Sequence, residues 1–314
     1  MVPAYKEPRP APVAGSKRKA AGLTMNYRHI YHAGNFADVV KHAVLVLILE
    51  RLAARPAPFF VFDSHAGLGR YDLTSAPAVR TGVSAGGIVR VLAAVAGHRP
   101  PPGLAGYLAA VAALNDPGTG PAGGGLRWYP GSPRLARALM RPGDRLVLAE
   151  AHPEDAAVLR REFADDAQVA VHHQDGYLGL KAHLPPRERR GLVLIDPPYE
   201  DGDEAARLVA GLAIGHRRWA TGIYALWYPI KEQAWVWRLH EAVIALGIPR
   251  VLAVELTLSP EDRGRLGGCG LLLVNPPWQL DLMLAELLPW LQRELGTGAG
   301  GVRVAWLVPE TPPG

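Results

Sequence analysis

The sequence contains a single cysteine, Cys269, among 314 residues, and no uncharged apolar segment is long enough to span a membrane. One cysteine excludes an intrachain disulfide and a zinc site built from several cysteines, which suits a reducing compartment. The chain also lacks the continuous N-terminal apolar segment of a secretory signal. We therefore expect a soluble, cytoplasmic protein with no membrane partner, in which Cys269 is a small packing residue.

Two common nucleotide-binding signatures are missing as well. Gly15-Ser16-Lys17 lacks the preceding strand and the spacing of a phosphate-binding P-loop. The glycine turn at Gly67 and Gly69 has Asp72 where a dinucleotide-binding fingerprint has its third glycine. These departures disfavour a P-loop NTPase and an NAD- or FAD-dependent oxidoreductase.

Excess positive charge is scarce outside the N-terminus. The net charge is +5, but residues 1–24 hold five basic side chains and one acidic side chain, so most of the excess lies there. This Pro-, Ala- and Lys-rich segment cannot bury enough apolar area to fold, and we interpret it as a disordered basic tail or a start-site artefact upstream of Met25. The nearly neutral remainder has no strong basic stripe for duplex DNA.

Several apolar runs end in an acidic residue. The four acids, in sequence order, are Asp63, Glu150, Asp175 and Asp196. Runs of this composition are typical of buried strands, and the carboxyl ends of successive strands of a doubly wound sheet meet at one edge. Each acid alone would more often be a helix cap or a turn residue. Four of them in order predict a ligand site at one edge of the sheet.

The first of these strands leads into the glycine turn from Asp63 to Gly69. The two glycines permit a tight turn and a close approach of the backbone to a ligand. S-adenosylmethionine (SAM) fits this turn better than a dinucleotide does, because SAM has no pyrophosphate. By position, Glu150 is expected to accept hydrogen bonds from ribose hydroxyls and Asp175 from an adenine amino group.

Asp196-Pro197-Pro198-Tyr199 is the most informative motif of the chain. The prolines hold the backbone extended and remove two N–H donors, which leaves carbonyls facing outward. The Asp196 carboxylate and the Pro197 carbonyl are suited to accept the two hydrogens of an exocyclic amino group, while Tyr199 stacks on an extruded planar base. The motif thus suits a planar base that carries an exocyclic amino group.

A second segment, Asn275-Pro276-Pro277-Trp278, matches the same amine-methylating pattern. Asp196 follows Asp175 at the spacing of consecutive strands, whereas Asn275 lies two strands further on. We therefore assign the catalytic role to Asp196. Asn275 is expected to form a structural turn, with Trp278 packed beneath the sheet.

The remaining patterns alternate between strand and helix, which predicts an α/β fold. Helices are predicted at 85–96, 104–114, 205–213, 233–246 and 280–295, and strands at 223–227, 250–257 and 271–274, the last two antiparallel. We interpret residues 25–73 and 127–314 as a methyltransferase domain and residues 74–126 as a helical insertion. The expected architecture is a Rossmann-like class I SAM-dependent methyltransferase sheet.

These motifs resemble those of the bacterial 23S ribosomal RNA adenine-N6 methyltransferases of the J type, from Met25 to about Glu310. The most specific elements are Tyr27-Arg28-His29, His32-Ala33-Gly34-Asn35, Ala37-Asp38-Val39-Val40-Lys41-His42, Asp63-Ser64-His65-Ala66-Gly67, Tyr129-Pro130-Gly131-Ser132-Pro133, Asp196-Pro197-Pro198-Tyr199-Glu200 and Ala225-Leu226-Trp227-Tyr228-Pro229. The resemblance implies SAM-dependent methylation of N6 of one adenine in 23S ribosomal RNA. We expect the protein to act as a monomer.

The resemblance also implies roles for single residues. The residues implied to hold SAM are His42, His65, Ser132, Glu150, Asp175 and Gly176. Asp196 would be the catalytic acceptor, supported by Lys41, and Tyr27 would contact the RNA, with His29 beside it. The histidines of this set have no accompanying spaced carboxylates or cysteines, so no metal site is expected.

Two alternative functions remain open on the sequence. A DNA adenine-N6 methyltransferase would use the same two loops, although DNA-recognition domains tend to be larger than the segment 74–126. A non-catalytic RNA-binding module would retain the fold without the reaction. Replacing Asp196 with Ala separates an enzyme from such a module, and labelled SAM with RNA or DNA separates the two substrates.

Overall fold

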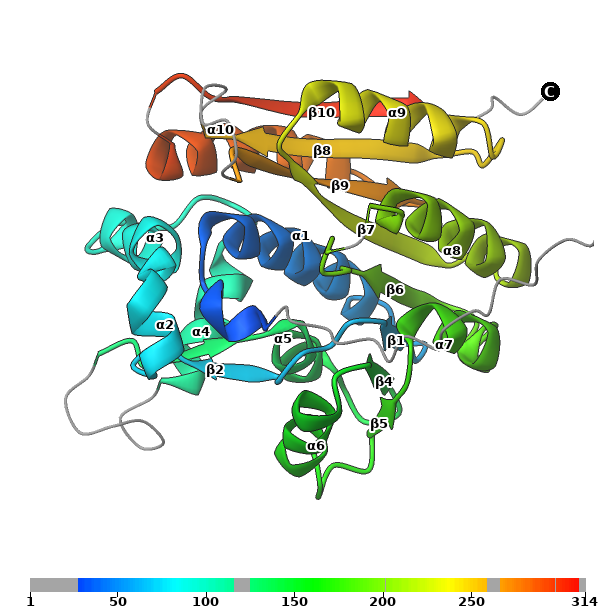
Figure 1. Ribbon diagram of the computed structural model, residues 1–314, viewed down its shortest axis with the longest axis horizontal. Helices are drawn as coiled ribbons and strands as arrows, with labels where there is room; N and C mark the ends of the chain where they lie inside the picture. Colours follow the sequence, from blue (N-terminus) through cyan, green and yellow to red (C-terminus); the bar gives the residue numbers. More distant parts are fainter. Residues whose placement is uncertain (1–27, 116–124, 201, 259–265, 297, 311–314) are drawn as a thin grey trace, which may run out of the picture.

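The computed structural model describes residues 28–115, 125–200, 202–258, 266–296 and 298–310, which form helices around one large sheet (Figure 1). The strands of this sheet are β1 (Phe60–Asp63), β4 (Arg145–Glu150), β5 (Val169–His173), β6 (Gly191–Ile195), β7 (Ile223–Ile230), β8 (Val251–Thr257), β9 (Gly268–Val274) and β10 (Gly301–Val308). Their spatial order is β10-β8-β9-β7-β6-β1-β4-β5. The predicted α/β fold class is confirmed.

The central strands run in one direction. β1 pairs in parallel with β4 on one side and with β6 on the other, and β5 and β7 extend this parallel set. β9 is antiparallel to both β7 and β8, as predicted for the last two strands, and β10 is antiparallel to β8. The chain leaves β1 for β4 on one side and later enters β6 on the other, so a crevice is expected at the carboxyl end of β1.

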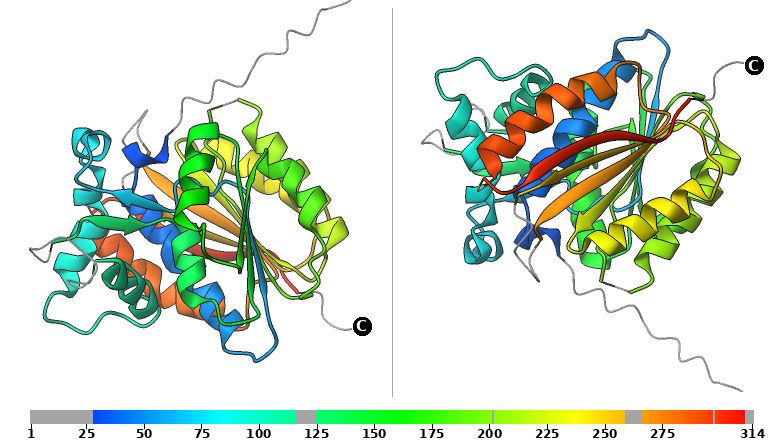
Figure 2. Two further views of the ribbon diagram at one scale, coloured as in Figure 1. Left: turned by 90° about the horizontal axis from the view of Figure 1, so that it is seen from below. Right: turned by 90° about the horizontal axis from the view of Figure 1, so that it is seen from above.

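Helices cover both faces of the sheet, as the edge-on views of Figure 2 show. One face packs against α1 (Phe36–Ala53), α5 (Ser132–Leu139), α6 (Pro153–Glu162) and α10 (Leu280–Leu295), and the other against α7 (Gly176–His183), α8 (Glu204–Arg218) and α9 (Gln233–Ile244). Each face has its own apolar cluster. Because both faces are covered, β1, β6 and β9 are buried throughout, which explains their continuous apolar sequence.

Helix α1 carries several of the residues that the sequence analysis selected, yet no helix was predicted there. Its side chains are buried from Phe36 to Leu49 because it lies between the sheet and α4, α5 and α10. A helix that is apolar on all sides has no amphipathic period, so its pattern does not identify it. Asn35 caps its N-terminus, since the Asn35 side chain accepts a hydrogen bond from the Asp38 amide at 2.8 Å.

The segment between β1 and β4 departs from the sheet and returns to it. Strand β2 (Arg70–Asp72) pairs antiparallel with β3 (Trp128–Pro130), and α2 (Ala76–Thr81), η2 (Val83–Gly86), α3 (Ile88–Val95) and α4 (Ala105–Leu114) lie between them in sequence. Helices predicted at 85–96 and 104–114 are present as α3 and α4. The small β2–β3 sheet was not predicted. It brings the two ends of this segment close together, which allows the segment to be an insertion into the larger sheet. The division into domains remains our proposal.

The second proline-proline motif forms a turn, but its tryptophan does not pack as expected. Asn275 has a left-handed φ of 53°, and its side chain donates to the carbonyls of Ala220 and Gly222. Trp278 was predicted beneath the sheet and is 78% exposed, so that expectation was wrong. The buried face of α10 begins only at Leu280, and Trp278 precedes it on the turn.

Cys269 is fully buried in β9, where burial raises the pKa of its thiol, so its packing role is confirmed. Within the described residues, no helix combines the length and apolarity needed to cross a membrane.

Candidate active site

A cavity of about 330 Å³ opens at the carboxyl ends of β1, β4 and β6. The predicted site residues that line it are His29, Lys41, His42, His65, Ser132, Glu150, Asp196, Pro197 and Tyr199. They come from η1 (His29–Tyr31), α1, the loop after β1, the start of α5 and the ends of β4 and β6. The topology therefore gathers segments that are far apart in the sequence.

The four strand-end acids do lie at one edge of the sheet. Asp63 and Glu150 are the last residues of β1 and β4, while Asp175 and Asp196 follow β5 and β6 closely. These strands are neighbours in the order β5-β4-β1-β6 and are all parallel. The expectation of one acidic edge is confirmed.

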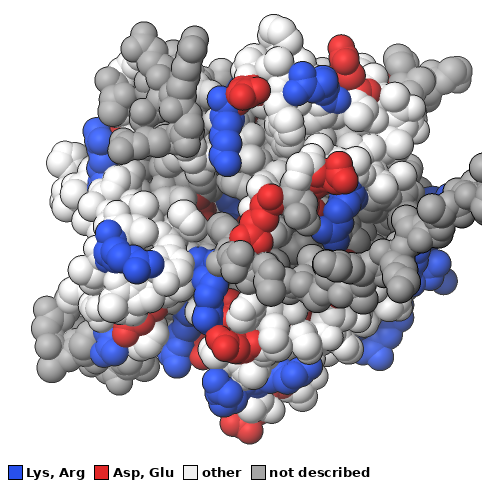
Figure 3. All heavy atoms as spheres, in the orientation of Figure 1, with Lys and Arg blue, Asp and Glu red and all other residues white. Residues whose placement is uncertain are grey.

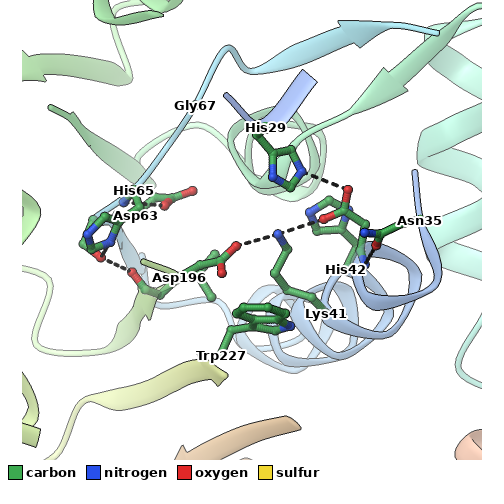
Figure 4. Close-up of polar contacts among 12 residues, drawn as sticks. His29, Asn35, Lys41, His42, Asp63, His65, Gly67, Asp196 and Trp227 are labelled. Carbon is green, nitrogen blue, oxygen red and sulfur yellow. Dashed lines mark hydrogen bonds and ion pairs between the residues drawn. The ribbon is translucent and has the colours of Figure 1, made fainter. Parts of the chain in front are cut away.

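Lys41 connects two of the carboxylates in this cavity (Figure 4). Its Nζ lies 2.6 Å from Asp196 Oδ2 and 2.9 Å from Asp38 Oδ1. Burial by itself would lower the pKa of Lys41, but the charges of Asp196 and Asp38 outweigh it and hold that pKa well above its usual value. Lys41 thus stays protonated and fixes the direction of the Asp196 carboxylate.

Asp38 extends this chain to His29. Its Oδ2 accepts a hydrogen bond from the Gly34 amide at 3.0 Å and lies 2.9 Å from His29 Nε2. Burial would raise the pKa of Asp38, but His29 and Lys41 together hold it well below its usual value. Asp38 was not selected from the sequence. Its i,i+3 spacing from Lys41, which places both on one face of α1, is the signal that could have found it.

Tyr199 lines the cavity and is anchored to β7. It has a left-handed φ of 52°, and its hydroxyl donates to the Trp227 carbonyl at 2.6 Å. Its ring meets the rings of Trp227 and Trp235 edge-on, with centroids 5.7 and 5.8 Å away. These contacts hold the ring in one place beside Asp196.

Glu150 is buried at the end of β4 and organises two loops. Its Oε2 accepts from the Gly67 amide at 2.8 Å, and its Oε1 accepts from the His152 amide at 2.7 Å. Burial raises the pKa of this carboxyl. A carboxylate has about four acceptor positions, so Glu150 can also accept from hydroxyl groups of a ligand.

Asp63 has a buried oxygen without a partner. Its Oδ1 accepts from the His65 amide at 3.3 Å, whereas no described residue hydrogen-bonds its Oδ2. Burial raises the pKa of Asp63 to about 6. Close by, Gly67 has a φ of 63°, and a Cβ there would lie 2.2 Å from the Tyr71 hydroxyl, so the turn requires glycine. Asp63 does not itself line the cavity, but a carboxyl with one oxygen free beside a turn of this kind suits a ligand that carries a cationic group.

His65 is held by its neighbour in the loop after β1. Its Nδ1 lies 2.8 Å from the Ser64 hydroxyl, which donates to the Leu194 carbonyl. Burial lowers the pKa of His65 to about 4, so the ring is neutral at physiological pH. In the part of the chain that the structure describes, no group of three or more His, Cys, Asp or Glu residues is arranged to hold a metal ion.

Residues 56–308 match the family model described as "Ribosomal RNA large subunit methyltransferase D, RlmJ". The chain belongs to the RlmJ family. Over 288 residues it is 44% identical to ribosomal RNA large subunit methyltransferase J of Escherichia coli and 41% identical to the Haemophilus influenzae protein of that name. Each match covers 91% of this chain and the whole of the relative. The predicted family is confirmed.

A solved structure shares the fold across almost the same range. The crystal structure of protein LPL1258 from Legionella pneumophila is similar with a TM-score of 0.80 and 30% sequence identity. The match covers 88% of this chain and 98% of that protein. The two proteins therefore share one fold over most of both chains.

Three residues implied by the resemblance are not placed in the cavity. Two of them lie outside its lining, and the third lies outside the described residues. Asp175 caps α7 by accepting from the Tyr177 and Leu178 amides, and its Oδ2 pairs with Arg207 at 2.8 Å. Gly176 packs so closely that a Cβ would lie 2.0 Å from the Ser64 carbonyl oxygen. Neither lines the cavity, so their roles remain predictions. Tyr27 lies outside the described residues.

Proposed function

We propose that this member of the RlmJ family transfers a methyl group from SAM to N6 of an adenine in 23S ribosomal RNA. The observation that carries the proposal is the position of Asp196, which Lys41 holds at 2.6 Å against the cavity wall beside Pro197 and Tyr199. Asp196, Pro197 and Tyr199 thus line one space. A planar base with an exocyclic amine suits all three.

The amine of adenine is a poor nucleophile because its lone pair is delocalised into the ring. In our proposal the Asp196 carboxylate and the Pro197 carbonyl accept its two hydrogens, which favours a more tetrahedral nitrogen with its lone pair directed out of the ring plane. N6 exchanges one proton for the methyl group, and the Asp196 carboxylate is placed to receive that proton. Fixed acceptors of this kind need no reorganisation during the reaction.

The residues of the cavity support SAM as the methyl donor. Glu150 offers acceptor positions to ribose hydroxyls. Asp63, which does not itself line the cavity, lies at the same edge of the sheet with its Oδ2 free. His42, His65 and Ser132 line the same space, and we propose that they bind the cofactor together with Asp175 and Gly176. SAM supplies a methyl group already activated on a sulfonium, so the protein mainly has to position the two reactants.

The proposed substrate is RNA with an extruded base. Tyr199 would stack on that base, and Tyr27 and His29 would contact the RNA around it. Lys and Arg side chains are interspersed with Asp and Glu on the face shown in Figure 3, so recognition would depend on the fit of a folded RNA more than on a uniform basic surface. We propose that the protein acts as a monomer in the cytoplasm.

The test compares 23S ribosomal RNA from cells with and without this gene by mass spectrometry. We expect one adenine to lose its N6-methyl group in the deletion strain and to regain it with the wild-type gene, but not with an Asp196→Ala gene. An unchanged methylation pattern would refute the proposal. Incubation of the purified protein with labelled SAM and either ribosomal RNA fragments or duplex DNA separates the two nucleic acids.

A further inference from the structure

Three buried aromatic side chains form a hydrogen-bonded chain that ends at the cavity. The Tyr107 and Tyr129 hydroxyls lie 3.0 Å apart, and the Tyr129 hydroxyl lies 2.8 Å from His42 Nδ1. Tyr107 belongs to α4, Tyr129 to β3 and His42 to α1. Tyr107 and Tyr129 are fully buried, and His42 is only 1% exposed. The chain therefore joins the segment between β1 and β4 to a cavity residue.

The positions of the protons follow from counting donors and acceptors along this chain. If Tyr107 donates to Tyr129 and Tyr129 donates to His42 Nδ1, each hydroxyl hydrogen has an acceptor. In the reverse direction His42 Nδ1–H donates to Tyr129 and Tyr129 donates to Tyr107. The Tyr107 hydrogen then has no acceptor among the described residues, and a buried donor without an acceptor is costly.

The first arrangement leaves the single hydrogen of a neutral imidazole on Nε2. Burial, with the nearby charge of Lys41, lowers the pKa of His42 well below its usual value, so the ring is neutral. Nδ1 is used by Tyr129, and Nε2 is the nitrogen that remains for the cavity that His42 lines. His42 then presents a donor, which suits an anionic group.

We propose that Tyr129 is a positioning residue that fixes His42 as the Nε2–H tautomer, so that the imidazole donates to the carboxylate at the amino-acid end of the cofactor. This inference rests on the proposed function for the identity of the ligand. The tautomer itself is a property of the ligand-free protein. The two parts are therefore measured separately.

The experiment compares three tyrosine variants of the full-length protein with the wild type. Tyr107→Phe keeps the Tyr129 hydroxyl as donor to His42. Tyr129→Phe removes that donor and leaves the Tyr107 hydroxyl without its acceptor, which also destabilises the fold. The double variant Tyr107→Phe/Tyr129→Phe removes both hydroxyls and leaves no orphaned donor. It shows the effect on His42 without the effect of a buried unpaired hydroxyl.

The first measurement is the ¹⁵N spectrum of histidine-labelled, ligand-free protein, in which His42→Gln identifies the His42 resonances. We expect a protonated Nε2 and an unprotonated Nδ1 in the wild type and in Tyr107→Phe. In both variants that lack the Tyr129 hydroxyl, the two ¹⁵N shifts should move toward each other as the ring exchanges between tautomers. A protonated Nδ1 in the wild type, or unchanged shifts in the double variant, would overturn the proposal.

The second measurement is the affinity for S-adenosylhomocysteine, by calorimetry. The double variant should bind it about three- to tenfold more weakly, as expected for one weakened hydrogen bond, while Tyr107→Phe binds as the wild type does. The KM for RNA should not change. Wild-type affinity in a double variant with altered ¹⁵N shifts would overturn the assigned cofactor contact. A wild type that fails to methylate ribosomal RNA would refute the proposed function and leave the tautomer result unaffected.

Discussion

At the residue scale, the centre of the site is a buried cation between two carboxylates. Lys41 is 4% exposed and Asp38 is 2% exposed, and the Lys41 Nζ contacts both Asp38 and Asp196. A buried ion pair of this kind adds little net stability when intact, but removing one partner leaves the other charge uncompensated. We infer that the arrangement serves to orient the Asp196 carboxylate.

Replacing Lys41 with Met removes the charge and retains much of the side-chain volume. We expect the free energy of unfolding to fall by about 3 kcal/mol, because Asp38 and Asp196 then face each other without a cation, and methyl transfer to be lost. Urea denaturation and a labelled-SAM assay measure the two effects. Lys181→Met, on the exposed side of α7, is the matched control and should change neither. Wild-type stability and rate in Lys41→Met would contradict this role.

Asp63 predicts a pH dependence of stability. Its pKa is raised to about 6 by burial, above the ordinary value of 3.8. Because this carboxyl pKa is raised in the folded protein, the free energy of unfolding that Asp63 contributes is fully present below pH 3.8. It is lost as the pH rises through 6. Asn does not titrate. The free energy of unfolding of Asp63→Asn, measured relative to that of the wild type, should therefore increase by at most about 3 kcal/mol as the pH rises from 4 to 8. Urea denaturation at several pH values tests this, and a difference that does not vary with pH would exclude it.

At the element scale, the sequence predicted most strands of the described residues but only five of their ten α-helices. Strands β1, β4 and β6 were found because burial on both faces gives continuous apolar runs. Helix α1 was missed because it is buried on all sides and has no amphipathic period. Strand β10 was missed although its last five residues, 304–308, form an apolar run. Trp278 was misplaced because its proline-rich turn ends before the buried face of α10 begins.

The start of α7 depends on a close backbone contact. A Cβ at Gly176 would lie 2.0 Å from the Ser64 carbonyl oxygen, next to Asp63 at the end of β1. Gly176→Ala should displace α7 and lower the free energy of unfolding by about 1–3 kcal/mol. Thermal unfolding is the measurement. Gly86→Ala, where a Cβ would meet nothing within 4 Å, serves as the control. Equal stability of the two variants would show that α7 is not held this tightly.

At the scale of the whole molecule, the parallel strands explain why the site could be assembled from the sequence at all. Acids that are far apart in the chain meet because the carboxyl ends of β5, β4, β1 and β6 share an edge. Side-chain pairing could not be predicted in the same way. The contacts of Lys41 with Asp38 and Asp196, and of His42 with Tyr129, depend on how α1 packs against the sheet.

Most of the excess positive charge lies in residues 1–24. The relatives from Escherichia coli and Haemophilus influenzae are each covered over their full length by a match that includes only 91% of this chain. We therefore expect a protein that begins at Met25 to methylate RNA at the wild-type rate within about twofold, with a similar salt dependence of RNA binding. Methylation and filter binding at several salt concentrations measure both. A large loss of RNA affinity at moderate salt would instead assign an RNA contact to this segment.

The central claim is that Asp196 makes the adenine amine reactive in a cavity that holds SAM. Its most direct test is single-turnover methyl transfer to a 23S ribosomal RNA fragment by the wild type and by Asp196→Asn, together with the affinity of each for S-adenosylhomocysteine. We predict a rate lower by about 10²- to 10³-fold in the variant, with an affinity within about threefold of the wild type. A wild-type rate in Asp196→Asn would contradict the account.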